Sequence, residues 1–152
     1  MDDIIEFNVP GQPVAKGRPR FSTITGRTYT PEKTTNYENL VRLSYMQAYP
    51  NQTPYEKNVQ LSMTINAYFQ IPKATSKKKA EQMRTHIIRP TIKPDTDNIA
   101  KSVCDALNKV AFYDDSQIVV LKVRKYYGDN PSVNIIIHDI KGDIEDENKI
   151  MH

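Results

Sequence analysis

The chain has 152 residues, of which 38% are hydrophobic and 26% are charged, a composition typical of one domain with one hydrophobic core. Cys104 is the only cysteine, which excludes an intrachain disulfide and a cysteine-based zinc site. No segment approaches the roughly 20 apolar residues of a membrane helix, and the acidic residues 2–3 are unlike the start of a signal peptide. We expect a cytoplasmic protein with no membrane segment, in which any metal is bound by oxygen ligands.

The charge is unevenly distributed along the chain. From Gly142 onward, four carboxylates accompany one lysine, a net charge of −3, so residues 1–141 carry +3 − (−3) = +6. A basic body suits a polyanionic partner, and an ordinary solvated surface is the alternative. We expect one domain over residues 1–141. The acidic segment 142–152 has few apolar residues, which predicts a disordered tail.

The first half of the chain predicts two strands, a hairpin and a helix. An apolar run ending at a Pro-Gly pair predicts a strand over residues 4–9, and a turn at Gly26 suggests a small hairpin. Thr30 followed by proline is a typical helix start, and apolar residues then recur at helical spacing over residues 31–49. Apolar and polar residues alternate over residues 59–71, which predicts a half-buried strand.

The second half predicts two helices and two further strands. A short helix is expected over residues 76–84 and a longer one, with one apolar face, over residues 97–111. Apolar residues then predict strands over residues 117–127 and 132–140. Residues 128–131 (GDNP) carry turn residues, which favour a hairpin connection between these strands.

This order of elements predicts a fold of the α+β class. We expect a single small domain with a mixed or antiparallel sheet of about four strands and two main helices, largely on one face of the sheet. An exposed edge strand would leave backbone groups unpaired, which favours a partner subunit.

Two aspartates at the start of the second long helix are candidates for metal binding. Asp95 and Asp97 lie two residues apart just before or at the helix N-terminus. Two such carboxylates repel each other, and a divalent cation would relieve that repulsion and activate water beside a phosphate. The alternative is helix capping, which accounts for one of the two aspartates.

Further charged residues lie along and beyond this helix. Lys101 follows Asp97 by one turn and could hold a phosphate oxygen, or could simply form a surface ion pair. Asp114 and Asp115 lie beyond the far end of the helix, where an ordinary polar turn is the alternative. They reach Asp95 only if the next strand, or a second subunit, brings them back.

A basic loop near the N-terminus is a candidate for DNA binding. It contains Lys16, Arg18 and Arg20 together with Phe21 and a stiffening proline. Cations and an aromatic ring in a rigid loop suit contact with a phosphate backbone. A solvated basic loop is the alternative.

Several of these segments together resemble the RusA-type Holliday junction resolvases. The resemblance extends to about Ile140, and its motif is specific because several residues match at fixed separations. The segments that carry it are FNVPGQPV (7–14), KGRPR (16–20), KPDTDNI (93–99), Lys101, DAL (105–107) and FYDDSQI (112–118).

The resemblance implies a small α+β homodimer that binds branched DNA, specifically four-way junctions, and makes paired symmetric nicks with Mg²⁺, or Mn²⁺ as a substitute. By position, Asp95, Asp97 and Asp115 match the metal-binding catalytic carboxylates of the family, and Lys101 matches its essential lysine. The role of Asp114 stays open. The family is common in bacterial phages and prophages.

The segment 73–93 is longer than in compact members of the family, which leaves its DNA contacts open. Two other functions remain as alternatives: a broader nuclease of flaps and other branched DNA, and a non-catalytic DNA-binding dimer. Whether each active site is built from one subunit or two also stays open at this point.

Overall fold

A four-stranded mixed sheet forms the centre of the protein, for which a computed structural model describes residues 4–143. The strands lie in the order β1-β6-β4-β5. Strand β6 is antiparallel to both β1 and β4, whereas β5 is parallel to β4. The mixed sheet and the α+β class are therefore confirmed. The strands are β1 (Ile4–Pro10), β4 (Leu61–Gln70), β5 (Ile118–Gly128) and β6 (Ser132–Asp139).

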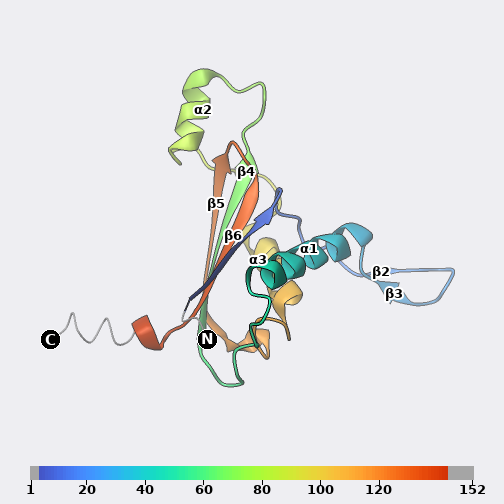
Figure 1. Ribbon diagram of the computed structural model, residues 1–152. Coiled ribbons are helices and arrows are strands. Elements are labelled where there is room, and N and C mark those ends of the chain that lie inside the picture. The colour runs from blue at the N-terminus through green and yellow to red at the C-terminus, as the bar shows by residue number, and fades with distance from the viewer. Residues whose placement is uncertain (1–3, 144–152) are drawn as a thin grey trace.

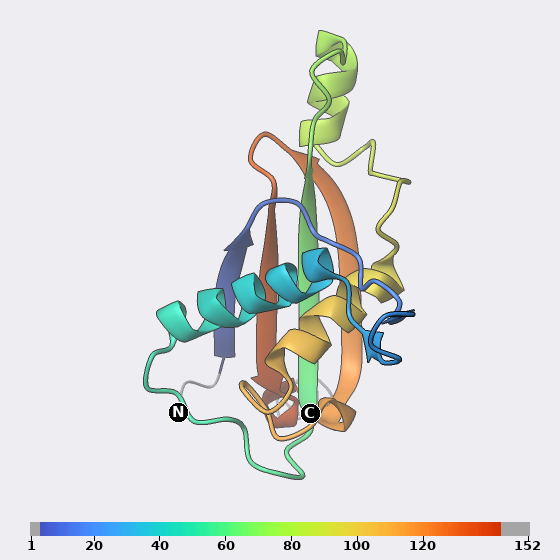
Figure 2. The same cartoon turned by 90° about the vertical axis from the view of Figure 1, so that its right-hand side faces the viewer.

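Two helices, α1 (Glu32–Ala48) and α3 (Thr96–Leu107), cover one face of the sheet, as expected (Figures 1 and 2). The short helix α2 (Lys77–Arg84) stands beyond one end of the sheet. Arg84 fixes it there through paired hydrogen bonds to Asp129, in the β5–β6 connection. None of the helices in the described part of the chain has the length and apolar character of a membrane span.

The core lies between the sheet and these two helices. On β4, alternate residues such as Met63, Ile65 and Phe69 are fully or almost fully buried under the helices. The residues between them, such as Asn66, project from the other face, where Asn66 donates a hydrogen bond to Asn134 of β6. The two-residue alternation in the sequence thus reports the two faces of one central strand.

The expected hairpin between the last two strands is wrong. Strand β4 lies between β5 and β6, so the connection over residues 129–131 passes over the end of β4 and its flanking strands do not pair. The same turn residues serve either connection. Pairing is decided by the parallel contact of β5 with β4, which a local pattern does not report.

Helix α3 ends at Leu107, four residues before the expected end. Asn108 is extended and Lys109 adopts a left-handed conformation with φ of 68°, so the chain leaves the helix there. At the C-terminus, residues 142–143 continue a helical turn, and Asp143 lies 3.0 Å from Nε2 of His138. The rest of the expected tail, residues 144–152, lies outside the described residues.

A two-stranded hairpin projects from the body beside α1 (Figure 1). Its strands are β2 (Arg20–Phe21) and β3 (Thr28–Tyr29). Gly26 adopts φ of 70° in the turn, a conformation that glycine adopts without strain. This confirms the expected hairpin and places the basic loop at its base.

Candidate active site

Helix α3 begins with two exposed aspartates whose carboxylates are not used for capping. Asp95 occupies the N-cap position, and its backbone carbonyl accepts a hydrogen bond from the amide of Ile99 at 3.0 Å, but its side chain makes no capping bond. Among residues 4–143, neither Asp95 nor Asp97 has a side-chain hydrogen bond or ion pair. The capping alternative therefore does not account for either carboxylate.

Asp97 lines a shallow hollow between α3 and β5, which we call the α3–β5 hollow. Its other lining residues are Thr96, Ala100, Leu121 and Val123. Strand β5 thus runs back alongside α3 toward the helix start. The following strand provides the return path, one of the two routes that the sequence left open.

Asp115 lies on the same side of α3 but further along the helix. Its amide donates a hydrogen bond to the side chain of Asn108 at 3.1 Å. Burial, together with the negative charges of Asp115 and Asp105, raises the pKa of the Cys104 thiol to about 12. Asn108 is the C-cap of α3, so the backbone of Asp115 lies at the opposite end of the helix from Asp97.

The three expected metal ligands are therefore not gathered at one point. Within the described part of the chain, no group of three histidine, cysteine, aspartate or glutamate side chains is arranged to hold a metal ion. Asp95 and Asp97 stay close in sequence at the helix start, and Asp115 stands at the other end of the stripe formed by Asp97, Cys104 and Asn108.

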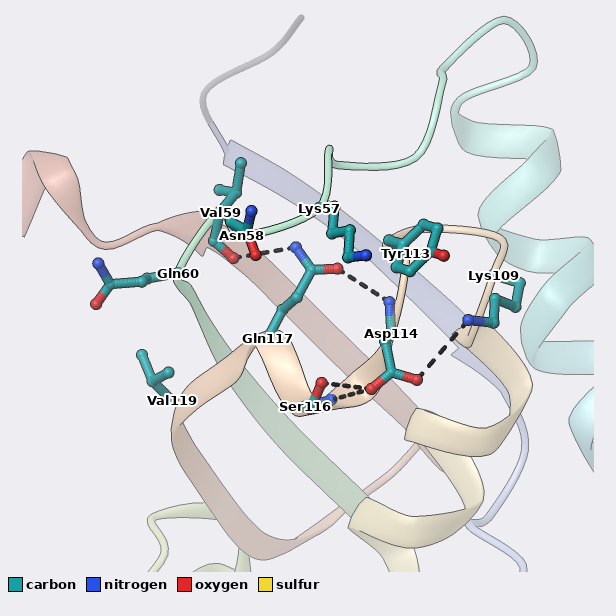
Figure 3. A pocket seen from close by; sticks show the side chains of 10 residues that line it. All are labelled: Lys57, Asn58, Val59, Gln60, Lys109, Tyr113, Asp114, Ser116, Gln117 and Val119. Atoms are coloured by element: carbon teal, nitrogen blue, oxygen red, sulfur yellow. Dashed lines mark hydrogen bonds and ion pairs between the residues drawn. The ribbon is translucent and has the colours of Figure 1, made fainter.

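Asp114 has a structural role that distinguishes it from its neighbour. It caps the short 3₁₀ helix η1 (Asp115–Gln117) by accepting a hydrogen bond from the Ser116 amide at 3.0 Å (Figure 3). The hydrogen bonds from the Ser116 hydroxyl and amide lower the pKa of the Asp114 carboxyl, and nearby Lys109 adds to the effect. The polar-turn alternative thus describes Asp114.

The cations of Lys101 and of the basic loop divide by whether they have an ion-pair partner. Lys101, Arg18 and Arg20 make no ion pair with any described residue, and all three are exposed. Lys16 instead lies 2.5 Å from Glu38 and 3.1 Å from Asp105. Its burial opposes the charged form, but the hydrogen bonds and charges of these two carboxylates outweigh that effect and raise the pKa of Lys16.

Lys16 therefore anchors the basic loop to α1 and α3. The next residue, Gly17, donates its amide to Oγ1 of Thr34 at 2.9 Å. A Cβ atom at Gly17 would lie 2.8 Å from that oxygen and 2.9 Å from Pro31, so only glycine allows this approach. The loop is held at its base, and Arg18 and Arg20 are left facing solvent.

Sequence reasoning missed a second group of residues, beside η1. Tyr113 is 48% exposed, and the ammonium groups of Lys57 and Lys109 lie 5.3 Å and 4.3 Å from its ring centroid. These three residues line a cleft of about 410 Å³ (Figure 3), which we call the Tyr113 cleft. No motif marks it, because Lys57 comes from a distant segment. The remaining lining residues are Asn58, Val59, Gln60, Asp114, Ser116, Gln117 and Val119.

Comparison with known proteins gives the family. Residues 10–138 match the family described as Endodeoxyribonuclease RusA. The chain belongs to the RusA family. This range includes the basic loop, both aspartates at the start of α3, and Asp115.

Two relatives cover almost the whole chain. The "Uncharacterized protein YqaN" of Bacillus subtilis (strain 168) is 40% identical over 142 residues, which are 91% of this chain and 98% of the relative. The "Crossover junction endodeoxyribonuclease rusA" of Lactococcus phage r1t is 28% identical over 138 residues, 89% of this chain and 96% of the relative. The RusA-family resemblance in the sequence is thus confirmed at the level of the family.

Proposed function

We propose that this protein is a divalent-metal-dependent endodeoxyribonuclease that resolves four-way DNA junctions by paired symmetric nicks. The observation that carries the proposal is the pair of exposed carboxylates of Asp95 and Asp97, which no described residue engages. Folded proteins usually give a carboxylate at a helix start a capping bond. Asp95 and Asp97 make no such bond, so both carboxylates are available to a ligand. Membership of the RusA family, and the phage relative named as a crossover junction endodeoxyribonuclease, support the substrate.

The donor set fits Mg²⁺ or Mn²⁺. Both ions prefer carboxylate oxygen, and Asp95 and Asp97 supply it at the mouth of the α3–β5 hollow. A divalent ion bound there supplies positive charge next to a phosphate and lowers the pKa of water. Asp115 matches a third ligand by position in the family motif, but among the described residues it does not join Asp95 and Asp97 in one group, so these two carboxylates carry the proposed ion.

The other residues of the site act on the DNA strand directly. Lys101 lies one turn beyond Asp97 with its ammonium group unpaired among the described residues. It offsets negative charge that develops on the scissile phosphate. Arg18 and Arg20 contact the DNA backbone away from the scissile bond, while Lys16 holds their loop in place.

A second subunit fits the free half of strand β5. Val119, Val120 and Leu121 are 53%, 39% and 48% exposed on this edge, and β5 pairs only with β4 among the described strands. The other half of β5 is approached by the chain leading into α3, since Lys125 donates to the carbonyl of Ile92. An apolar edge of this kind favours pairing with another copy. A two-fold dimer would present two sites to a nearly two-fold junction.

Cleavage of a synthetic four-way junction in Mg²⁺ tests the proposal. Asp97→Asn should abolish paired nicking and leave junction binding within about twofold of wild type, because only a ligand oxygen is changed. Asp139→Asn is the control: an asparagine oxygen still accepts the hydrogen bond from the Lys141 amide, so cleavage should persist. Undiminished cleavage by Asp97→Asn would remove the assigned site. Tight junction binding without any cleavage by the wild type would favour a non-catalytic binding dimer. Faster cutting of flaps than of junctions would favour a broader branched-DNA nuclease.

A further inference from the structure

The Tyr113 cleft combines an exposed aromatic ring with two cations, and the proposed cleavage chemistry uses none of them. Lys57 and Lys109 approach the ring of Tyr113 from separate segments of the chain. Tyr113 as a whole residue keeps 48% of its surface exposed. An aromatic face beside cations is the arrangement that binds an unpaired nucleotide, because the base stacks while the phosphate meets the ammonium groups.

Hydrogen bonds of one buried side chain join the walls of this cleft. Gln117 is buried, and its amide group donates to the carbonyls of Glu56 at 2.7 Å and Val59 at 3.1 Å. The side-chain oxygen of Gln117 accepts from the amide of Asp114 at 2.9 Å. One side chain thus joins the turn that carries Lys57 to the turn that follows Tyr113. A site held in this way loses little freedom when a ligand binds.

Backbone strain is concentrated at the same place. Asn58 and Lys109 both line the cleft and have φ of 76° and 68°. They are two of the three non-glycine residues with positive φ in residues 4–143, the third being His86. Lys109 occupies the position after a helix C-cap where glycine is usual. Strained residues of this kind gather at binding sites, where the surrounding structure maintains them.

The position and size of the cleft fit a DNA strand. Tyr113 lies two residues before Asp115, so the cleft opens at the far end of the stripe that begins at Asp97. Helix α3 has 12 residues and spans about 18 Å, a length of about five stacked nucleotides. The volume of the Tyr113 cleft, about 410 Å³, is within the usual range for a pocket that binds a small ligand.

We propose that the Tyr113 cleft binds one unstacked nucleotide of a DNA strand, with the base on the ring of Tyr113 and a phosphate between Lys57 and Lys109. This role rests on the proposed function for its choice of DNA as the ligand. A bound phosphate would compete for both lysines with the ring, and for Lys109 also with the carboxylate of Asp114, 3.8 Å away; a charged phosphate attracts an ammonium group more strongly than an exposed ring does.

Binding of a fluorescent oligonucleotide of about eight thymidines in EDTA tests the cleft without requiring cleavage. Tyr113→Ala should weaken binding roughly 5- to 100-fold, while Tyr113→Phe keeps the stacking face and should bind like wild type. Lys109→Asn tolerates the left-handed backbone, removes the cation, and should lower the salt slope by about 0.7. Unchanged binding by Tyr113→Ala would overturn the proposal.

The absence of tryptophan from the sequence allows a second readout. Tyr113→Trp introduces a single tryptophan, whose fluorescence a stacked 5-bromouracil base should quench. Tyr49→Trp is the control, because Tyr49 bonds to Glu6 of β1, at the opposite edge of the sheet. Bound oligonucleotide with no quenching at position 113, or inorganic phosphate competing as well as a nucleotide, would overturn the proposal. Tyr113-dependent binding in a protein that fails to cut junctions would count against the proposed function alone.

Discussion

The aspartates around helix α3 divide into two groups by what their carboxylates contact. Asp105 pairs with Lys16 and Asp114 caps η1. Asp95, Asp97 and Asp115 have no side-chain hydrogen bond or ion pair with any described residue. Chemically identical side chains thus serve to hold the fold or stay available to a ligand. Adjacent residues, Asp114 and Asp115, fall into different groups.

The thiol of Cys104 makes a prediction about alkaline stability. Its pKa is raised to about 12 by burial and by Asp115 and Asp105, against an ordinary thiol value near 8.5. Between about pH 9 and 12 the unfolded chain releases this proton and the folded chain keeps it, so the free energy of unfolding should fall as pH rises. Burial raises the pKa of Tyr37 in the same direction. Urea unfolding at pH 7 and pH 10 measures the loss.

Cys104→Ala is the variant that separates the effect of the thiol from that of the buried tyrosines. It should reduce the loss of stability between these pH values, although it also removes the contact with Met63 and lowers stability at pH 7. An unchanged pH dependence in Cys104→Ala would assign the whole effect to the buried tyrosines.

The residue types of the candidate site could be predicted from the sequence. Which of them have a hydrogen-bond or ion-pair partner could not. The spacing of Asp95, Asp97 and Lys101 follows from one helix, which a local pattern reports. That Asp114 rather than Asp95 is the capping residue depends on backbone angles at each helix start. The Tyr113 cleft depends on Gln117 reaching a segment far away in the sequence, which no local pattern carries.

At the scale of elements, the helices and strands were predictable because their periodicity is local. The four main strands and three helices lie within a few residues of their expected bounds. The order of strands was not predictable. Strand β5 pairs in parallel with β4 and not with β6, because the helix α3 crossover carries the chain back alongside β4.

The basic loop provides a prediction at this scale, since its cations have different surroundings. Arg18→Ala should lower the salt dependence of junction binding by about 0.9 in the log–log slope, the value for one lost phosphate contact. Thermal stability should not change, because the exposed Arg18 has no partner among the described residues.

Lys16→Ala is the matched variant and should behave in the opposite way. It leaves Glu38, only 15% exposed, without its ion pair, and should lower Tm by roughly a few degrees. Binding would then weaken through a displaced loop. A stability loss in Arg18→Ala, or a normal Tm in Lys16→Ala, would contradict this division of roles.

At the scale of the whole molecule, the free edge of β5 and the candidate active site lie together. Leu121 lines the α3–β5 hollow with Asp97, while Val119 lines the Tyr113 cleft. Pairing of two β5 edges about a two-fold axis would extend the sheet from one subunit to the next. It would also bring the two active sites to one side of the interface, with a separation fixed by the strands.

Val120→Lys should therefore shift the proposed dimer to a monomer. Val120 is the register partner of Ser62 on β4, and it lines neither the α3–β5 hollow nor the Tyr113 cleft. A charge there opposes burial of the edge without altering a site residue. Sedimentation should show a fall from 2 × 17.5 = 35 kDa toward 17.5 kDa. Ile24→Lys, at the 95% exposed tip of the β2–β3 hairpin, is the control and should stay dimeric.

Paired nicking should become single, uncoupled nicking in the Val120 variant, since one monomer presents one site to a junction. A dimer of unchanged mass in Val120→Lys would place the subunit interface on another face of the protein.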